Sequence, residues 1–181
     1  MINRAEARAL VETHVANRNL VKHMLAVEAV MRGLARRFGE DEELWDVTGL
    51  LHDLDYTVTV DNPARHAHVT CEMLAGKLPA EALHAILAHP EHVPPESRFD
   101  WALYCSDPVT GLVVAAALMH PTRKLASLDL DFLKRRFQEK RFAAGANREQ
   151  IQQCRQVGLE LDDFLQLALT AMQGIAGELG L

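Results

Sequence analysis

The sequence predicts an all-helical protein, a single domain of about seven to nine helices. Apolar residues recur at alternating steps of four and three along residues 20–38, which is the spacing of one face of an amphipathic helix. Capping residues, glycines and prolines separate further segments with the same periodicity. The one strand-like run, residues 57–60 (Thr-Val-Thr-Val), is too short and too isolated to form a sheet.

End signals define the first two predicted helices. The apolar series over residues 20–38 is followed by Gly39, a residue type that commonly ends helices. Asp41 then supplies the N-cap of a second helix over residues 41–51. Two glutamates occupy the first turn of this helix, where the helix macrodipole favours negative charge.

Prolines bound the third and fourth predicted helices. Asn62 and Pro63 form a typical pair of N-cap and first helical residue, and Gly76 closes the helix that they open. Pro79 opens a fourth helix, and Pro90 stops it.

Capping signals and apolar periodicity predict the remaining helices. Ser97 with Asp100 resembles a capping box in front of an apolar segment, and Asn147 with Gln150 resembles another. Apolar periodicity then continues over residues 161–179. This last helix is either a core element or the contact face of a homo-oligomer.

Length and composition favour one globular domain over residues 1–181. The chain is long enough to bury a core, and 49% hydrophobic with 24% charged residues is ordinary for a globular protein. It contains no repeat, low-complexity tract or long linker. We expect a core over about residues 17–125 and C-terminal helices over about residues 128–181 that pack on it.

Net charge and segment lengths exclude several functional classes. A formal charge of -6 argues against a binder of nucleic-acid polymers, which needs a basic face. A small anionic substrate remains compatible, because a metal ion can invert the charge of a site. The longest apolar run, residues 112–119, is shorter than the roughly 20 residues that a bilayer requires. Acid occurs early in the chain, where a secretory signal is apolar, so we expect a cytoplasmic protein without membrane contact.

Histidines and aspartates fall where helices can bring them to one metal ion. Six of them are candidate ligands: His23 on the apolar side of the first helix, His52 and Asp53 at the end of the second, His66 in the first turn of the third, His89 in the last turn of the fourth, and Asp107 before Pro108 at a later helix end. Imidazole nitrogen with carboxylate oxygen suits Fe, Mn, Co, Ni or Zn. The absence of cysteine from the set disfavours a structural zinc site. Each residue alone has an ordinary alternative, since a single buried histidine is more often hydrogen-bonded than metal-bound.

The order of these residues resembles a known signature. His23, then His52-Asp53, then Asp107 is similar to the H…HD…D pattern of the HD superfamily of metal-dependent phosphohydrolases. Residues 49–55 (Gly-Leu-Leu-His-Asp-Leu-Asp) look like the motif around its His-Asp pair, although an HD-Ile-Gly version is more usual. Further stretches resemble a subgroup of HDIG-like predicted hydrolases, at residues 65–74, 85–89, 107–112 and 134–145. The Gly-Tyr-Pro motif of HD proteins that degrade cyclic dinucleotides is missing, which argues against that substrate.

The resemblance implies a set of ligand roles. One divalent transition metal would be bound by four residues, His23, His52, Asp53 and Asp107. A second ion would share Asp53 and take His66 and His89. In that arrangement Asp53, His66 and His89 are the catalytic group around a water that attacks phosphorus, and the substrate is a phosphate mono- or diester, such as a nucleotide or a related small phosphorylated metabolite.

Several polar residues have two interpretations. His68 and His92 flank the second-metal ligands and are outer contacts of the site, substrate contacts or ordinary solvated histidines, with His92 the candidate for a substrate contact. Asp55 either orients a ligand histidine or is a turn residue. Arg136 and Lys140, in the strongest basic cluster of the chain, are candidate phosphate contacts, although most of that cluster is expected to be a solvated helix face.

The sequence leaves two alternatives to a hydrolase. The ligand set overlaps with that of HD-type di-iron oxygenases, which cleave C–C or C–P bonds. A metal-bound regulatory module without turnover is the other alternative. The absence of a flavin, haem or nicotinamide signature, beside a site suited to making metal-bound hydroxide, favours hydrolysis by water over the oxygenase.

Overall fold

The computed structural model describes all 181 residues and contains helices but no strand. The helices of seven or more residues are α1 (Arg4–His14), α2 (Arg18–Phe38), α3 (Glu42–Leu51), α5 (His68–Leu74), α6 (Ala80–Ala88), α7 (Arg98–Met119), α8 (Leu130–Gln138) and α11 (Leu161–Gln173). Shorter segments are α4 (Tyr56–Thr59), α9 (Arg148–Gln152), α10 (Cys154–Val157) and α12 (Ala176–Leu179), with 3-10 turns at Pro63–Arg65 and Leu125–Ser127. The all-helical prediction is confirmed.

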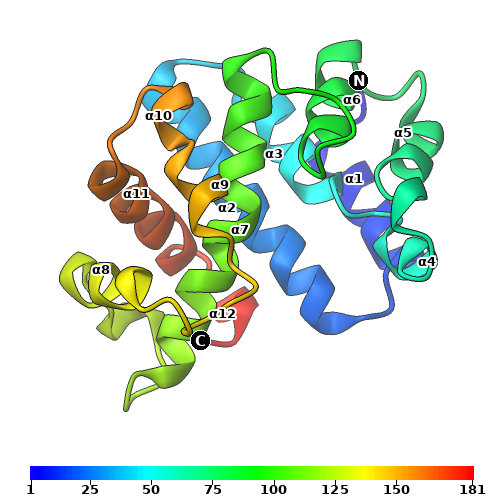
Figure 1. Cartoon of the computed structure of the whole chain (residues 1–181). Coiled ribbons are helices and arrows are strands. Elements are labelled where there is room, and N and C mark those ends of the chain that lie inside the picture. Colours follow the sequence, from blue (N-terminus) through cyan, green and yellow to red (C-terminus); the bar gives the residue numbers. More distant parts are fainter.

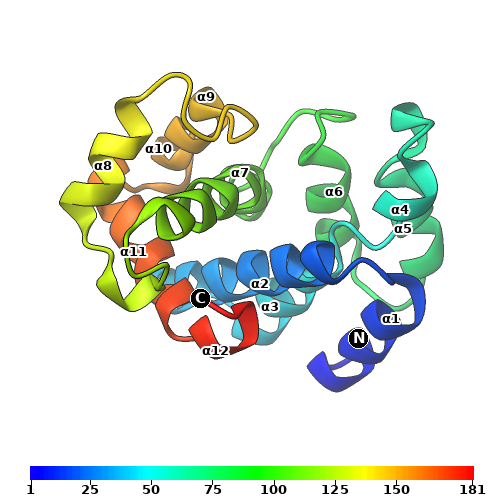
Figure 2. The ribbon, with the colours of Figure 1, turned by 90° about the horizontal axis from the view of Figure 1, so that it is seen from below.

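The two longest helices, α2 and α7, form the centre of the molecule. Figures 1 and 2 show them between a group formed by α1, α4, α5 and α6 and a second group formed by α8 to α11. Helix α2 also packs along α3 and α11. Eleven of the 21 residues of α2 and 14 of the 22 residues of α7 are buried, so much of the apolar surface that drives folding lies on these two helices.

One hydrophobic core joins the two ends of the chain. A cluster of 48 buried residues extends from Ala7 in α1 to Leu179 in α12. Phe164 and Met172 of α11 belong to it and are fully buried. The C-terminal helices therefore complete the same core that α2 and α7 begin.

Helices α2 and α3 approach each other closely at Gly49. A Cβ atom at this position would lie 3.0 Å from the Met31 side chain and 3.1 Å from backbone atoms of Glu28. Close contact here brings the C-terminal end of α3, with His52 and Asp53, against α2. The missing side chain of Gly49 thus helps to position the predicted ligands.

Helix α1 was not among the predicted helices. Its N-terminus is a capping box of Asn3 and Glu6, but only Ala7 and Val11 are buried, which is too little apolar burial to give a clear periodic signal. Arg4 holds the helix to the core, with its Nε 2.5 Å from Glu28 Oε1.

The predicted last helix over residues 161–179 is divided into α11 and α12. Two predictions about the helices that carry candidate ligands are also wrong. Asp107 does not lie at a helix end, because α7 continues through Pro108 to Met119. A proline inside a helix costs about 3 kcal/mol, and the extensive burial of α7 offsets this cost. His66 does not lie in the first turn of a helix either, since the predicted helix from Asn62 is broken into a 3-10 turn and α5. Ala67, at the break, has a φ of 63°.

The break has a tertiary cause. The Asp55 carboxylate accepts a hydrogen bond from the backbone N–H of Thr70 at 3.0 Å, which caps the first turn of α5 from outside the segment. The other oxygen of Asp55 lies 2.8 Å from His66 Nδ1. One carboxylate therefore fixes both the start of α5 and the position of His66.

Helix α7 is long and apolar enough to cross a membrane by length and composition, with a mean hydropathy of 1.5 over its most apolar window. Of that window, 61% is buried inside the protein, as is usual for a core helix.

Candidate metal centre

The structure brings together all six predicted ligands. They come from five parts of the chain: His23 from α2, His52 and Asp53 from the end of α3, His66 from the segment before α5, His89 from the end of α6, and Asp107 from α7. All of them except the fully buried His52 line one pocket of about 520 Å³.

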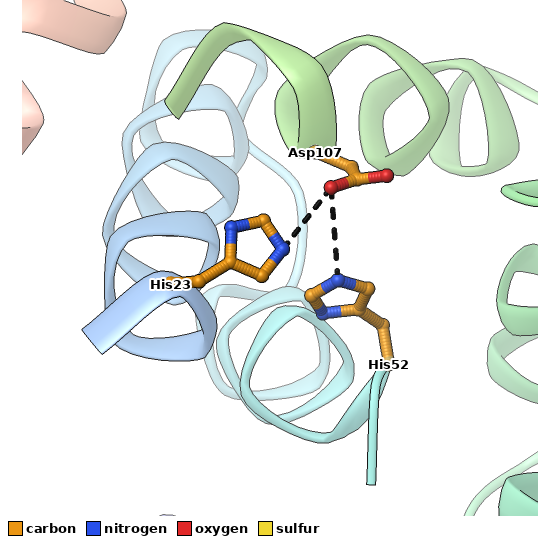
Figure 3. A group of neighbouring side chains, drawn as sticks. All are labelled: His23, His52 and Asp107. Carbon is orange, nitrogen blue, oxygen red and sulfur yellow. Dashed lines mark ion pairs between the residues drawn. The ribbon is translucent and has the colours of Figure 1, made fainter. Parts of the chain in front are cut away.

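Three of these residues form a first group of potential ligands. The ligand atoms of His23, His52 and Asp107 lie within 4.8 Å of one another. Figure 3 shows the three side chains pointing toward a common position, with Asp107 Oδ1 3.1 Å from His23 Nε2 and 4.0 Å from His52 Nε2. Burial raises the pKa of Asp107, but the hydrogen bond from His23 and the charges of His23 and His52 together outweigh burial and lower the pKa overall.

Asp53 joins this group to a second one. Its Oδ2 lies 3.6 Å from His23 Nε2 and 3.5 Å from His52 Nε2. Its Oδ1 lies 3.3 Å from His66 Nε2 and 3.5 Å from His89 Nε2. One carboxylate thus presents an oxygen to each pair of histidines, which is the arrangement that a bridging ligand requires.

All four histidines present Nε2 to the centre and use Nδ1 elsewhere. His52 Nδ1 lies 2.8 Å from the Gly49 carbonyl oxygen, and His89 Nδ1 lies 2.6 Å from the Ile86 carbonyl oxygen. Carbonyl oxygens only accept hydrogen bonds, so both Nδ1 atoms carry the proton in the neutral rings. The lone pairs of the two Nε2 atoms then face the centre, ready to bind a cation.

The same logic applies to His23. The Thr110 hydroxyl donates to the Asp107 carbonyl oxygen at 2.9 Å, so it has a lone pair, and no proton, to offer His23 Nδ1 at 3.1 Å. His23 Nδ1 is therefore the donor, and its Nε2 is free for a metal when the ring is neutral. Thr110 lies one turn after Asp107 in α7, so a single helix supplies a ligand and the group that orients another.

A buried nitrogen atom without a hydrogen-bond partner gives separate support for a metal at this cluster. His52 Nε2 is fully buried and has no hydrogen-bond partner, an arrangement that costs about 1–3 kcal/mol in an ordinary core. Burial also lowers the pKa of His52 to about 4, so the ring is neutral at neutral pH and its Nε2 carries a lone pair. A bound cation would satisfy this atom. Nitrogen and carboxylate donors without cysteine suit Fe, Mn, Co, Ni or Zn.

His66 lies beside two carboxylates, and without a bound cation its ring is protonated. Burial lowers the pKa of His66, but hydrogen bonds to Asp53 and Asp55 outweigh this effect and raise it to about 9. His66 Nε2 also lies 3.2 Å from His89 Nε2. A proton on His66 takes the position that faces Asp53 and His89, so metal at this half of the site competes with that proton.

We expect Asp55→Ala to weaken metal binding at the His66 side selectively. Of its two interpretations, the contact with His66 Nδ1 supports the orienting role for Asp55. Loss of such an outer contact lowers metal affinity about 10- to 100-fold. Calorimetric titration with Mn²⁺ should show a weakened second binding event and an unchanged first one.

Two controls accompany this experiment. Asp55→Asn keeps a carbonyl oxygen for His66 and should recover part of the affinity, and Asp61→Ala removes a nearby exposed aspartate and should change nothing. Equal weakening of both events by Asp55→Ala would contradict a local orienting role.

The predicted substrate residues lie outside this pocket. His92 Nε2 is 2.9 Å from the His66 carbonyl oxygen, and its ring lies 4.6 Å from that of His68, so His92 contacts the ligand segment without lining the cavity. Arg136 pairs with Glu139 at 3.0 Å, and Lys140 lines a different cavity. The structure does not bring Arg136 or Lys140 together with the metal cluster.

Sequence reasoning missed the remaining wall of the pocket. This wall consists of Asn17, Leu20, Tyr56, Pro90 and Gln150. Asn17 was recognisable as a helix cap in front of α2, but nothing in the local sequence indicates that it faces a pocket. Gln150 comes from α9, almost 100 residues after Asp53, so its position depends entirely on the tertiary fold.

Comparison with known proteins agrees with the geometry. The HD domain family matches residues 20–116, which include all six candidate ligands. The chain is 32% identical over 97 residues to a Ribonuclease Y from Oleidesulfovibrio alaskensis, covering 52% of this chain and 18% of that protein. It is 28% identical over 109 residues to a Ribonuclease Y from Opitutus terrae, covering 59% of this chain and 19% of that protein.

These matches extend over about a fifth of the length of each ribonuclease, so they concern one region of those proteins. No solved structure matches the chain. The family match covers more than half of the chain and contains the whole candidate metal cluster. The chain belongs to the HD domain family.

Proposed function

We propose that this protein hydrolyses a phosphate mono- or diester in a nucleotide or a related small phosphorylated metabolite. The HD domain family is generally one of metal-dependent phosphohydrolases, and the structure contains a His/Asp cluster that could hold a metal. The observation that carries the proposal is the set of histidines whose Nε2 atoms converge on Asp53, with each Nδ1 held by another group.

The candidate ligands would have different roles in this reaction. His23, His52, Asp53 and Asp107 would hold one ion, and Asp53, His66 and His89 would hold a second. When bound, divalent transition metals supply Lewis-acid chemistry at phosphoryl oxygens and at an attacking water. The fully buried His52 would act as a ligand alone, whereas the other five ligands line the pocket. Among these five, Asp53, His66 and His89 would contact the reacting groups.

The size of the pocket supports a small substrate. A volume of about 520 Å³ lies within the usual range of roughly 300–1,000 Å³ for small-molecule sites. The acidic net charge supports the same conclusion, because a polymer of nucleotides needs an extended basic surface.

Ribonuclease activity is the second candidate function. The observation in its favour is the likeness to two proteins named Ribonuclease Y, over 97 and 109 residues. A phosphodiester of RNA could be attacked by the same centre. The two candidates differ in whether a single-stranded RNA or a small phosphoester is the better substrate.

Isotope labelling tests the proposed function. Mn²⁺-loaded protein is incubated anaerobically in oxygen-18 water with p-nitrophenyl phosphate, a small nucleotide and, separately, a short RNA. We expect turnover of the small esters with one labelled oxygen in the released phosphate, because water is the nucleophile. Consumption of substrate only in air, with gas-derived oxygen in the product, would support the oxygenase alternative and overturn the proposal. Metal binding with no turnover of any substrate would support the regulatory alternative.

A further inference from the structure

Apart from the candidate metal ligands, the residues that line the pocket include no Lys or Arg side chain. Five ligand residues line the pocket together with Asn17, Leu20, Tyr56, Pro90 and Gln150. Sites that bind several phosphates use Lys or Arg side chains to compensate the negative charge. Here the metal centre alone would have to do so.

The cations next to the pocket residues in the sequence either have other partners or do not line the pocket. Lys22, which precedes His23, lines a different cavity. Arg148, two residues before Gln150, donates hydrogen bonds to five backbone carbonyl oxygens. Arg65, next to His66, lies 2.8 and 3.0 Å from the two carboxylate oxygens of Glu72. Arg18 follows Asn17 but does not line the pocket. None of these residues is positioned to hold a second or third phosphate.

Acidic residues lie beside the wall instead. Glu91 follows Pro90 and accepts a hydrogen bond from the Tyr104 hydroxyl, and Glu149 precedes Gln150. Burial raises the pKa of Tyr104, and the hydrogen bond to Glu91 and the charges of Glu91 and Glu149 raise it further. A polyphosphate chain extending past Gln150 would therefore meet negative charge.

We infer that the pocket selects substrates with a single phosphate group attached to a neutral, polar, ring-bearing moiety, which Asn17, Tyr56 and Gln150 contact. This inference rests on the proposed function and narrows its substrate class. It disfavours nucleoside triphosphates and RNA, in which further phosphates would reach the uncompensated wall.

Each of the three side chains has a free group for such a moiety. Asn17 uses Oδ1 to accept from the backbone N–H groups of Asn19 and Leu20, which fixes its amide and leaves the Nδ2 hydrogens to donate. Tyr56 lines the pocket, is 46% exposed and meets the His66 ring at 88°, so part of its ring surface is available for stacking. Gln150 offers both a donor and an acceptor.

Two of these residues lie outside the family region. The HD domain match covers residues 20–116, whereas Asn17 precedes it and Gln150 follows it. The ligands are thus supplied by the region that matches the family, and two of the three proposed contacts are supplied by segments outside that region. Selectivity is therefore expected to depend on α9 and on the start of α2.

Adding a positive charge to the pocket wall at Gln150 tests the inference. Metal-loaded wild-type protein and the Gln150→Lys variant are titrated calorimetrically with hydrolysis-resistant phosphonate analogues of a nucleoside monophosphate and of the corresponding triphosphate. Metal content is checked after each titration. We expect the wild type to bind the monophosphate analogue at least about 10-fold more tightly, and Gln150→Lys to shift this ratio about 5- to 10-fold toward the triphosphate analogue.

Gln152→Lys is the matched control, since it adds the same charge to the same helix at an exposed position outside the pocket. It should leave the ratio unchanged. Asn17→Asp keeps the helix cap but removes the amide donors, and it should weaken binding of the monophosphate analogue.

Two results would overturn the inference: tighter binding of the triphosphate analogue by the wild type, or equal shifts from Gln150→Lys and Gln152→Lys. Because binding is measured without turnover, this outcome is separate from the labelling experiment. Selective binding without hydrolysis would contradict the proposed function, and hydrolysis without selectivity would contradict the inference.

Discussion

Replacing Asp53 with Ala is expected to remove both metal sites and to lower phosphohydrolase activity by at least about 10³-fold. The reason is the position of its two oxygens, of which Oδ2 faces His23 and His52 and Oδ1 faces His66 and His89. No other candidate ligand contacts both pairs. Elemental analysis of the purified variant, together with a phosphate-release assay, measures the two effects.

The matched variants are His66→Ala and His89→Ala. Each removes a side chain that faces Asp53 Oδ1, so each should reduce the metal content to about one ion per chain and leave the His23 side occupied. Thermal unfolding of the metal-free proteins separates loss of metal from loss of fold. Full metal content in folded Asp53→Ala protein would show that Asp53 is not a bridging ligand.

Replacing Gly49 with Val is expected to reduce the free energy of unfolding by about 3 kcal/mol. Even a Cβ atom would lie 3.0 Å from Met31 Cγ and 3.1 Å from the backbone of Glu28, so α2 and α3 must move apart. For a chain of this length the unfolding temperature should fall by about 6–12 °C. Differential scanning calorimetry of the metal-free protein measures the change.

The same substitution should also weaken metal binding, because the Gly49 carbonyl oxygen accepts the hydrogen bond that orients His52. Gly111→Ala is the control, since Gly111 lies inside α7 with no atom within 4 Å of its would-be Cβ. Alanine there should stabilise the protein by about 0.5–1 kcal/mol. Equal stability of Gly49→Val and wild type would contradict the close approach of α2 and α3.

Local signals predicted much of the helical architecture. Asp41 caps α3, Gly39 ends α2 in the left-handed conformation, and Ser97 with Asp100 forms a capping box at the start of α7. These interactions lie within a few residues of one another, so the sequence contains them directly. The break at His66 depends on Asp55, and the passage of α7 through Pro108 depends on burial against other helices. Both are tertiary effects that sequence patterns do not contain.

The candidate ligands could be identified from the sequence, but their surroundings could not. The histidines and aspartates are distinctive residue types in a recognisable order, and their convergence follows once the helices pack. Thr110, Asn17 and Gln150 are common residue types whose roles depend on which helix faces the pocket. Arg136 and Lys140 illustrate the converse, because a local concentration of charge does not say which way a helix faces, and these residues lie away from the ligands.

The most direct test of the account is an anomalous diffraction experiment on crystals grown with Mn²⁺. We expect one anomalous peak among His23, His52 and Asp107 and a second beside Asp53, His66 and His89, with Asp53 within bonding distance of both. An ordered protein with no peak in this pocket, at a Mn²⁺ concentration that supports activity, would contradict the central claim that these residues form a metal centre.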